Sequence, residues 1–262
     1  MDGTPKPGEK PLRQSERREQ ILLELRLRPH VRISEMADRF GVSTETVRRD
    51  MDRLSEDGLI ERAHGGATAN RSYPDYHQRS RDRLEEREAI GRSAADLVQP
   101  GDSVMIDSGS TTVQLARFLA LAETPCTVVT NSLTVAMTMG QSAAAEVILC
   151  PGDYLPSEAA VVGTDTIEYL ARHCVDRCMI GASGVTQDGI TEAVRGFAAV
   201  KRAMLAGSEA SHLLVDNGKF GHCGLSQVGR LADLSSIVTD SVPDPDMTGA
   251  LDAGGVDLVI AE

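Results

Sequence analysis

The sequence predicts an α/β protein in which a small winged helix-turn-helix unit precedes a larger, Rossmann-like domain built on a parallel sheet. Two observations carry this prediction. Near the amino end, two short segments with helical apolar periodicity are separated by only three residues, 41–43. Beyond residue 101, short apolar runs without internal alternation take turns with amphipathic helical patterns, as in strands that helices cover on both faces.

Length and composition allow one or two domains with a sizeable core, because the chain has 262 residues of which 41% are hydrophobic. We expect a disordered polar tail at 1–14, a winged helix-turn-helix domain at 15–70, a linker at 71–87 and the sheet domain at 88–262. No apolar run reaches the roughly 18 residues that a membrane span needs, and the amino end lacks the apolar core of a signal peptide. We therefore expect a cytoplasmic protein with no membrane partner.

Three helices should form the amino-terminal unit. The first covers 17–27 and should bury Ile21, Leu22 and Leu25. The second covers 33–40, and its apolar face consists of Ile33, Met36, Ala37 and Phe40. Gly41 follows it at the point where a helix commonly ends in the left-handed conformation.

The third helix, 44–54, should bury one face and leave the other free to bind. Val47, Met51 and Leu54 form its apolar stripe at i, i+4 and i+7, and Ser43 precedes it as an N-cap. The second helix of a helix-turn-helix enters the DNA major groove, so its exposed polar side chains should meet bases and phosphates. The predicted DNA-contacting residues are Ser43, Thr44, Thr46, Arg48, Arg49 and Arg53. Residues 58–62 then suggest a turn and a strand that lead into a wing at 65–66.

Charge is distributed unevenly along the chain. Residues 1–70 carry 13 Lys+Arg and 13 Asp+Glu, whereas 71–262 carry 14 and 26, so the second part holds the whole net charge of −12. Such a chain is no general polyanion binder. DNA affinity must come from the local arginines, helped by dimerisation, and should be modest and salt-sensitive.

The body of the chain should contain seven parallel strands separated by helices. The predicted strands are 103–107, 127–130, 147–150, 178–181, 213–216, 237–240 and 258–261. Between the first two, Leu115, Phe118, Leu119 and Ala122 have the spacing of an amphipathic crossover helix. Ligands of such sheets bind at the carboxyl ends of the strands.

Polar residues gather where these strands should end. Asp107 ends the first strand, and a hydroxyl-rich turn follows it directly before a helix, consisting of Ser108, Gly109, Ser110, Thr111 and Thr112. The free amides of a helix start, with hydroxyls beside them, suit a phosphate group, although an ordinary capped helix start can have the same residues. Thr130, Asn131, Gly152 and the segment 216–219 follow other strands. We expect all of these residues to lie in one ligand-binding site.

Several stretches resemble the DeoR family of bacterial transcriptional regulators. The run VSTETVRRD at 42–50 and HGGA at 64–67 are similar to the family's amino-terminal signature, and DSGSTT at 107–112 and Asp216-x-x-Lys219 are similar to its effector domain. The resemblance implies an effector domain similar in fold to ribose-5-phosphate isomerase that senses phosphorylated sugars. It also implies that 108–112 hold the phosphate, that Lys219 supplies its counter-charge, and that Asp107 and Asn131 bind sugar hydroxyls.

One segment departs from the family's pattern. Where the family carries a pair of glycines followed closely by an arginine, this chain has Gly152 followed by Asp153 and no arginine. The acidic side chain would lie near the expected anion. The ligand is therefore either seated differently or unusual.

We expect a DNA-binding repressor of a carbohydrate-metabolism operon, without enzymatic activity, that works as a homodimer or homotetramer and is released from its operator by a phosphorylated sugar. Activation in place of repression is equally compatible with the residues. The alternative is a sugar-phosphate isomerase with an appended DNA-binding module, in which Asp107, Asp188 or Glu192 would be the base. The sequence lacks both nucleotide-binding glycine motifs and the G-x-S-x-G elbow of hydrolases.

The cysteines and histidines suggest no cofactor and no metal. The five cysteines are scattered without a C-x-x-C pair, so we expect buried thiols. His173, Cys174 and Cys178 lack the spacing and the second ligand pair of a zinc site. His30 should lie in a loop, and each of the other histidines should be structural or solvated.

Overall fold

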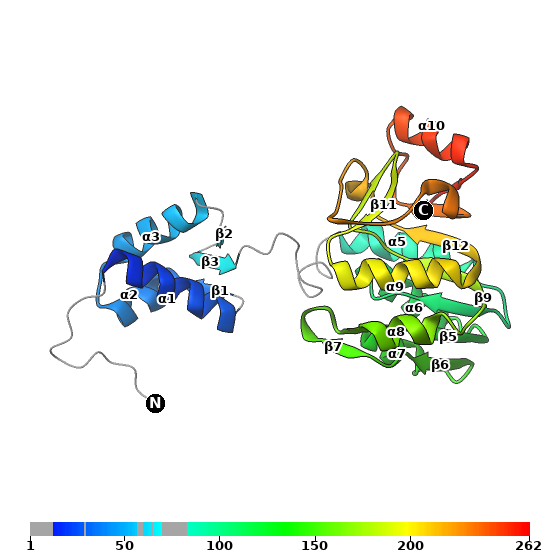
Figure 1. Cartoon of the computed structure of the whole chain (residues 1–262), viewed down its shortest axis with the longest axis horizontal. Coiled ribbons are helices and arrows are strands. Elements are labelled where there is room, and N and C mark those ends of the chain that lie inside the picture. Colours follow the sequence, from blue (N-terminus) through cyan, green and yellow to red (C-terminus); the bar gives the residue numbers. More distant parts are fainter. Residues whose placement is uncertain (1–12, 29, 57–59, 64, 70–82) are drawn as a thin grey trace. The chain divides into compact units, whose positions relative to one another are not determined.

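The computed structural model describes residues 13–28, 30–56, 60–63, 65–69 and 83–262. The chain forms two compact units, Met1–Tyr73 and Pro74–Glu262 (Figure 1). Residues 1–12 of the expected tail, 1–14, and most of the expected linker lie outside the described residues, and Gln14 already belongs to the first helix. Residues 84–87, which we assigned to the linker, instead form the first turn of a helix, α5, in which Arg87 is buried against Asp216 whereas Leu84 and Glu85 are exposed.

The amino-terminal unit contains three helices and a three-stranded sheet, as a winged helix-turn-helix requires. Its elements are α1 (Gln14–Leu27), β1 (His30–Arg32), α2 (Ile33–Phe40), α3 (Thr44–Glu56), β2 (Ile60–Ala63) and β3 (Gly66–Ala69). The strands pair antiparallel in the order β1-β3-β2. The prediction of a loop at His30 was wrong, because His30 pairs with Thr68 and this pairing brings Val31 into the core.

The apolar stripes of α2 and α3 pack together as predicted. Ile33, Met36, Ala37, Phe40, Val47, Met51 and Leu54 are all buried. Between the two helices, Gly41 has a left-handed φ of 64°, and the amide of Thr46 donates to Ser43 Oγ at 3.2 Å, which confirms the cap. Leu22 is only half-buried, since it lies off the face that Ile21 and Leu25 share.

Two buried carboxylates bind the helices of this unit together. Asp50 of α3 is 1% exposed, and its Oδ2 accepts a hydrogen bond from Arg17 Nε of α1 at 2.8 Å. Glu24 of α1 is likewise buried and forms ion pairs with Arg28 and with Arg39 of α2. The orientation of α3 is thus fixed by charge pairing as well as by apolar packing.

The carboxyl-terminal unit is built on a seven-stranded sheet in which every neighbouring pair is parallel. In spatial order its strands are β15 (Asp257–Ile260), β14 (Ser236–Thr239), β12 (Ser208–Leu214), β9 (Val175–Ile180), β4 (Ser103–Ile106), β5 (Cys126–Thr130) and β6 (Ala145–Leu149). All seven predicted strands belong to this sheet, and their ends differ by a few residues. β12, for example, extends back to Ser208 because its polar first residues pair with β9.

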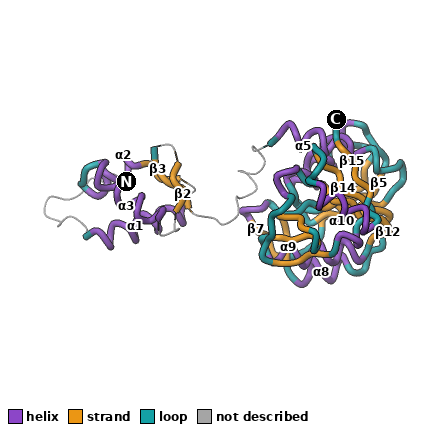
Figure 2. The backbone as a smooth tube through the Cα atoms, turned by 90° about the horizontal axis from the view of Figure 1, so that it is seen from above, coloured by secondary structure: helices purple, strands orange, loops and turns teal. Residues whose placement is uncertain are grey.

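Helices cover both faces of this sheet, so that strands lie between helices in Figure 2. One core forms beneath α5 (Leu84–Ala95), α6 (Ser110–Leu121) and α7 (Leu133–Met139). The other forms beneath α8 (Thr164–Leu170), α9 (Arg195–Ala206) and α10 (Pro245–Gly254). Within β4, Val104 and Ile106 face the first core and Met105 the second. Ala122, which we placed on the apolar face of α6, follows the end of that helix and is exposed.

Several short strands and turns were not predicted. β7 (Asp153–Leu155) and β8 (Ala160–Val162) form a hairpin around η1 (Pro156–Glu158), whereas β10 (Gly184–Thr186), β11 (Gly189–Glu192) and β13 (Ser226–Gly229) form a small antiparallel sheet. Two further turns are η2 (Asn217–Lys219) and η3 (Leu231–Asp233). Runs of three or four residues are too short for a clear period-two pattern.

The cysteine prediction was correct for three of the five thiols. Cys126, Cys150 and Cys178 are buried, whereas Cys174 and Cys223 are exposed because they lie in turns outside the main sheet. Burial raises the pKa of the Cys150 thiol to about 12. The described residues contain neither a group of three or more His, Cys, Asp or Glu side chains able to hold a metal ion nor a helix long and apolar enough to cross a membrane.

Candidate functional site

The carboxyl ends of the central strands bring several predicted site residues together. Ile106 pairs with Thr130 across β4 and β5, and the amide of Cys150 donates to Thr130 O at 2.8 Å. On the other side of β4, the amide of Asp107 donates to Met179 O of β9. Asp107, Thr130 and Asn131 therefore lie at one edge of the sheet, as predicted.

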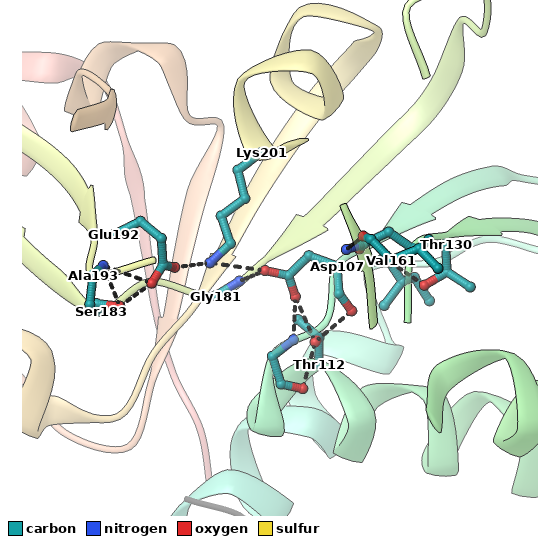
Figure 3. A network of polar contacts seen from close by, with 12 residues as sticks. Asp107, Thr112, Thr130, Val161, Gly181, Ser183, Glu192, Ala193 and Lys201 are labelled. Carbon is teal, nitrogen blue, oxygen red and sulfur yellow. Dashed lines mark hydrogen bonds and ion pairs between the residues drawn. The ribbon is translucent and has the colours of Figure 1, made fainter. Parts of the chain in front are cut away.

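Asp107 is held at the centre of this edge by four donors (Figure 3). Its Oδ1 accepts from the Gly109 amide at 2.9 Å and from Thr112 Oγ1 at 2.7 Å. Its Oδ2 accepts from the Gly181 amide at 2.9 Å and lies 3.3 Å from Lys201 Nζ. A carboxylate offers about four lone-pair positions, and here the protein occupies all four. The side chain therefore fixes the turn that begins at Ser108.

A buried lysine joins Asp107 to a second carboxylate. Lys201 of α9 is 5% exposed and also donates to Glu192 at the end of β11. Ser183 Oγ and the Ala193 amide donate to the other oxygen of Glu192. Burial alone would raise the pKa of Glu192, but the charge and hydrogen bond of Lys201, together with these two donors, hold it below its ordinary value. The cluster is an ordered carboxylate–ammonium–carboxylate bridge between the seven-stranded sheet and the sheet of β10, β11 and β13.

The hydroxyls of the turn after β4 differ in whether other described groups of the protein engage them. Thr112 Oγ1 is engaged with Asp107 and with Gly109 O. In contrast, no hydrogen bond within the described part of the chain engages the hydroxyls of Ser108, Ser110 and Thr111. The first intrahelical bond of α6 runs from the Val113 amide to Gly109 O, so the preceding helical amides lack helical acceptors. Amides and available hydroxyls thus converge at one helix N-terminus.

Asn131 has a buried acceptor that no described residue satisfies. Its Nδ2 donates to Val161 O of β8 at 3.0 Å, whereas its Oδ1 is buried without a partner in the described part of the chain. A buried orphan acceptor costs about 1–3 kcal/mol, which a ligand or water donor would offset. Thr130 is different, because its Oγ1 donates to Ile106 O and accepts from the Ser132 amide.

Gly152 belongs to a separate cavity. It starts the β7–β8 hairpin with a φ of 147°, and a Cβ there would lie 2.1 Å from Thr166 Oγ1. The cavity beside it measures about 240 Å³ and is lined by Gly152, Asp153, Val162, Gly163, Thr164 and Asp165, but not by 108–112. Gly152 is thus required by the hairpin, and Asp153 faces this second cavity.

Lys219 lies in η2, after β12 and one strand beyond β9, and is half-exposed. Its neighbour Asp216 is 2% exposed and accepts from Arg83 Nη1 at 2.7 Å and Arg87 Nη2 at 3.3 Å, both from the start of α5. Burial alone would raise the pKa of Asp216, but the Arg83 hydrogen bond and the charges of Lys219 and Arg87 lower it. Three cations therefore surround one buried carboxylate at this end of the sheet.

The outer face of α3 presents most of the predicted DNA-contacting residues. Ser43, Thr44, Arg48, Arg49 and Arg53 are exposed and Thr46 is half-exposed. The side chains of Arg48 and Arg49 are 55% and 77% exposed, and each forms an ion pair with Glu45, at 3.2 Å and 3.5 Å. The arginines thus lie along one helix surface with a carboxylate between them.

Sequence reasoning missed the roles of Arg83, Arg87, Lys201 and Asp216, and named Glu192 only as a possible base. For two of these residues, Lys201 and Arg87, the sequence pattern did indicate burial. Lys201 follows Phe197 by four residues and precedes Met204 by three. Arg87 precedes Ile90 by three residues and Ala94 by seven, so each charge lies on an apolar stripe. A charge in such a position is buried with a partner or not buried at all.

Comparisons with known proteins cover both units. The model of the DeoR-like helix-turn-helix domain matches residues 17–73, and that of the DeoR C terminal sensor domain matches 82–241. The HTH-type transcriptional repressor GlcR of Bacillus subtilis (strain 168) is 32% identical over 90% of this chain and 93% of its own length. The Glycerol-3-phosphate regulon repressor of Escherichia coli (strain K12) is 30% identical over 88% and 93%. The L-fucose operon activator of Haemophilus influenzae is 30% identical over 81% and 86%.

Similar solved structures include ribose 5 phosphate isomerase A from Neisseria gonorrhoeae, which has 13% identity and a TM-score of 0.39 over 51% of this chain and 52% of that one. This likeness is too distant to carry an argument about function.

Proposed function

Because this chain belongs to the DeoR family of transcriptional regulators, we propose that it is a repressor that binds operator DNA through α3 and is released by a phosphorylated sugar. The observation that carries the effector half is the start of α6, where amides without helical acceptors lie beside the hydroxyls of Ser108, Ser110 and Thr111, which no described residue engages. A phosphate supplies the acceptors that these donors need.

The remaining site residues have distinct parts in this proposal. Asp107, Thr112 and Thr130 shape the turn, because the protein already engages their polar atoms. Asn131 Oδ1 would accept from a sugar hydroxyl and so satisfy its orphan position. Lys219 would supply a counter-charge from the end of β12. Gly152 supports the neighbouring hairpin and lies outside the phosphate cradle.

The DNA-binding half rests on the exposed arginines of α3. Arg48 and Arg49 lie where the second helix of a helix-turn-helix meets base edges and phosphates. With a net charge of −12 on the chain, few such contacts give modest affinity per subunit. We propose a homodimer or homotetramer on paired half-sites, since symmetric assembly doubles the contacts.

The names of relatives support a regulator of sugar or polyol metabolism. One relative is a glycerol-3-phosphate regulon repressor and another an L-fucose operon activator. We propose repression for this chain, with no turnover of the effector. Of the three carboxylates that could be the base of an isomerase, Asp107 and Glu192 have their oxygens held by donors and by Lys201, and Asp188 is exposed in the turn between β10 and β11.

A thermal-shift panel tests the effector. It contains phosphorylated pentoses and hexoses, glycerol 3-phosphate, the unphosphorylated parents and inorganic phosphate. A ligand at 100 times its dissociation constant should add about 2.7 kcal/mol to the free energy of unfolding, and the parent sugars should not. The double variant Ser110→Ala, Thr111→Val should lose the shift, whereas Thr138→Val, a hydroxyl change on α7, should keep it.

Two outcomes would contradict this function. A thermal shift that persists in the double variant would show that the phosphate does not bind at the start of α6. If the purified protein interconverted sugar phosphates of the panel, the protein would be an isomerase and not a sensor.

A further inference from the structure

The start of α5 is tied to the η2 loop across 133 residues of sequence. Arg83 is the first described residue after 70–82, the stretch through which the chain reaches this unit from the DNA-binding unit. Its backbone has a φ of 51°, a left-handed conformation that arginine rarely adopts. Its guanidinium ends 2.7 Å from Asp216 Oδ1. The residue at which the chain enters α5 is thus held by Asp216, the N-cap residue of η2.

Asp216 holds η2 with the same oxygen. Its Oδ1 also accepts from the Gly218 amide at 3.1 Å, and Lys219 is the last residue of this turn. Arg87, whose side chain is 5% exposed, contacts the other oxygen at 3.3 Å. One buried carboxylate therefore connects the beginning of α5 with the turn that carries Lys219.

Gly218 makes room for the Arg83 side chain. A Cβ on Gly218 would lie 2.6 Å from Arg83 Nη1 and 2.9 Å from Asp216 Oδ1. The backbone of Gly218 is not in the left-handed region, so alanine is conformationally allowed. The absence of a side chain there is what lets the guanidinium reach Asp216.

We propose that Arg83, Arg87 and Asp216 couple the effector site to the segment that leads to the DNA-binding unit. This inference rests on the proposed function of Lys219. An anion that binds Lys219 competes with Asp216 for that charge. Asp216, Gly218 and Lys219 belong to one short turn. A shift of Lys219 toward the ligand therefore also moves Asp216 Oδ1, to which Arg83 donates, and the backbone of Gly218 beside the guanidinium. Ligand occupancy then changes how firmly the entry to α5 is held.

A hydrogen-exchange experiment on the full chain tests the coupling without any ligand. Arg83→Gln removes the charge, and Gly218→Ala displaces the guanidinium while keeping every charge. Both should speed exchange of the amides at 87–90, the first of α5 that donate within the helix, beginning with the Arg87 amide to Arg83 O, even though Gly218 is remote from them in sequence. The matched control is Glu86→Gln, which removes the other partner of Arg83, 3.7 Å away, and should leave this exchange unchanged. Unaltered exchange in Gly218→Ala would overturn the proposal.

A second arm measures the response of DNA binding. The wild-type chain selects a duplex from a random pool, and its affinity is measured with and without the panel sugar phosphate that gives the largest thermal shift. A coupling of ordinary size changes affinity about 5- to 150-fold. In Arg83→Gln this ratio should fall toward 1 while the thermal shift remains. A full response in Arg83→Gln would overturn the coupling. If no panel member shifts the wild type, the effector assignment fails, and the exchange experiment still decides the coupling.

Discussion

Replacing Lys201 with methionine should destabilise the carboxyl-terminal unit strongly. The change keeps the length of the apolar stem but leaves Asp107 and Glu192 without their shared cation. Removing one partner of a buried ion pair costs about 3–5 kcal/mol. Asp107 retains three hydrogen bonds and Glu192 two, so we expect the lower end of this range, about 3 kcal/mol.

Calorimetry of the full chain measures this loss. For a unit of this size, 1 kcal/mol shifts the melting temperature by about 2–4 °C, so Lys201→Met should lower it by about 6–12 °C. Arg202→Met is the matched control, because the next residue of α9 is exposed and donates to Gln227 O. Its cost should stay below about 1 kcal/mol. Adding Glu192→Gln to Lys201→Met should recover part of the stability, since it removes one uncompensated charge. A loss below about 1 kcal/mol for Lys201→Met would refute the bridging role.

Three further predictions concern other parts of the chain. Arg48→Ala or Arg49→Ala should weaken binding to a selected duplex by about 1–3 kcal/mol if the side chain reads a base; unchanged affinity in a titration of both variants would remove this face from the interface. Lys219→Ala should leave DNA binding intact and abolish the response to the effector, so full release of DNA by the effector in this variant would show the counter-charge to lie elsewhere. Burial, and secondarily the charge of Arg177, lowers the pKa of His212 from 6.5 to about 4, so the unfolded state binds more protons between these values. The free energy of unfolding should therefore fall as pH drops below 6.5, by up to about 1.4 kcal/mol per pH unit. In a pH series of urea unfolding, His212→Gln should flatten this slope and the exposed His222→Gln should not; equal slopes in both variants would contradict the assignment.

Regular periodicity explains which parts of the fold were predictable. The stripes of α2 and α3 and the seven apolar strand segments each repeat one simple pattern over enough residues to be recognised. β1, the β7–β8 hairpin and the small antiparallel sheet are too short for that. They form because longer elements position them, as when β3 brings His30 into register with Thr68.

The site was predictable only in outline. The rule that ligands of parallel sheets bind at strand ends placed Asp107, Thr130 and Asn131 at one edge, and the structure brings them together there. The rule does not distinguish a hydroxyl that faces a ligand from one, such as Thr112, that the protein itself engages. The burial of charges on apolar stripes, such as Asp50, Arg87 and Lys201, was not predicted, because their partners come from other elements of the chain.

The carboxylate of Glu45 between Arg48 and Arg49 has a consequence for how the regulator discriminates among duplexes. In the proposed DNA-bound state each guanidinium exchanges this intramolecular anion for a phosphate or a base edge, and losing the exposed ion pair costs about 0–1 kcal/mol. A correct base sequence adds hydrogen bonds that the carboxylate cannot match. In that state Glu45 would subtract the same free energy from binding to random DNA and to the operator, which is a larger share of the weaker, non-specific binding free energy.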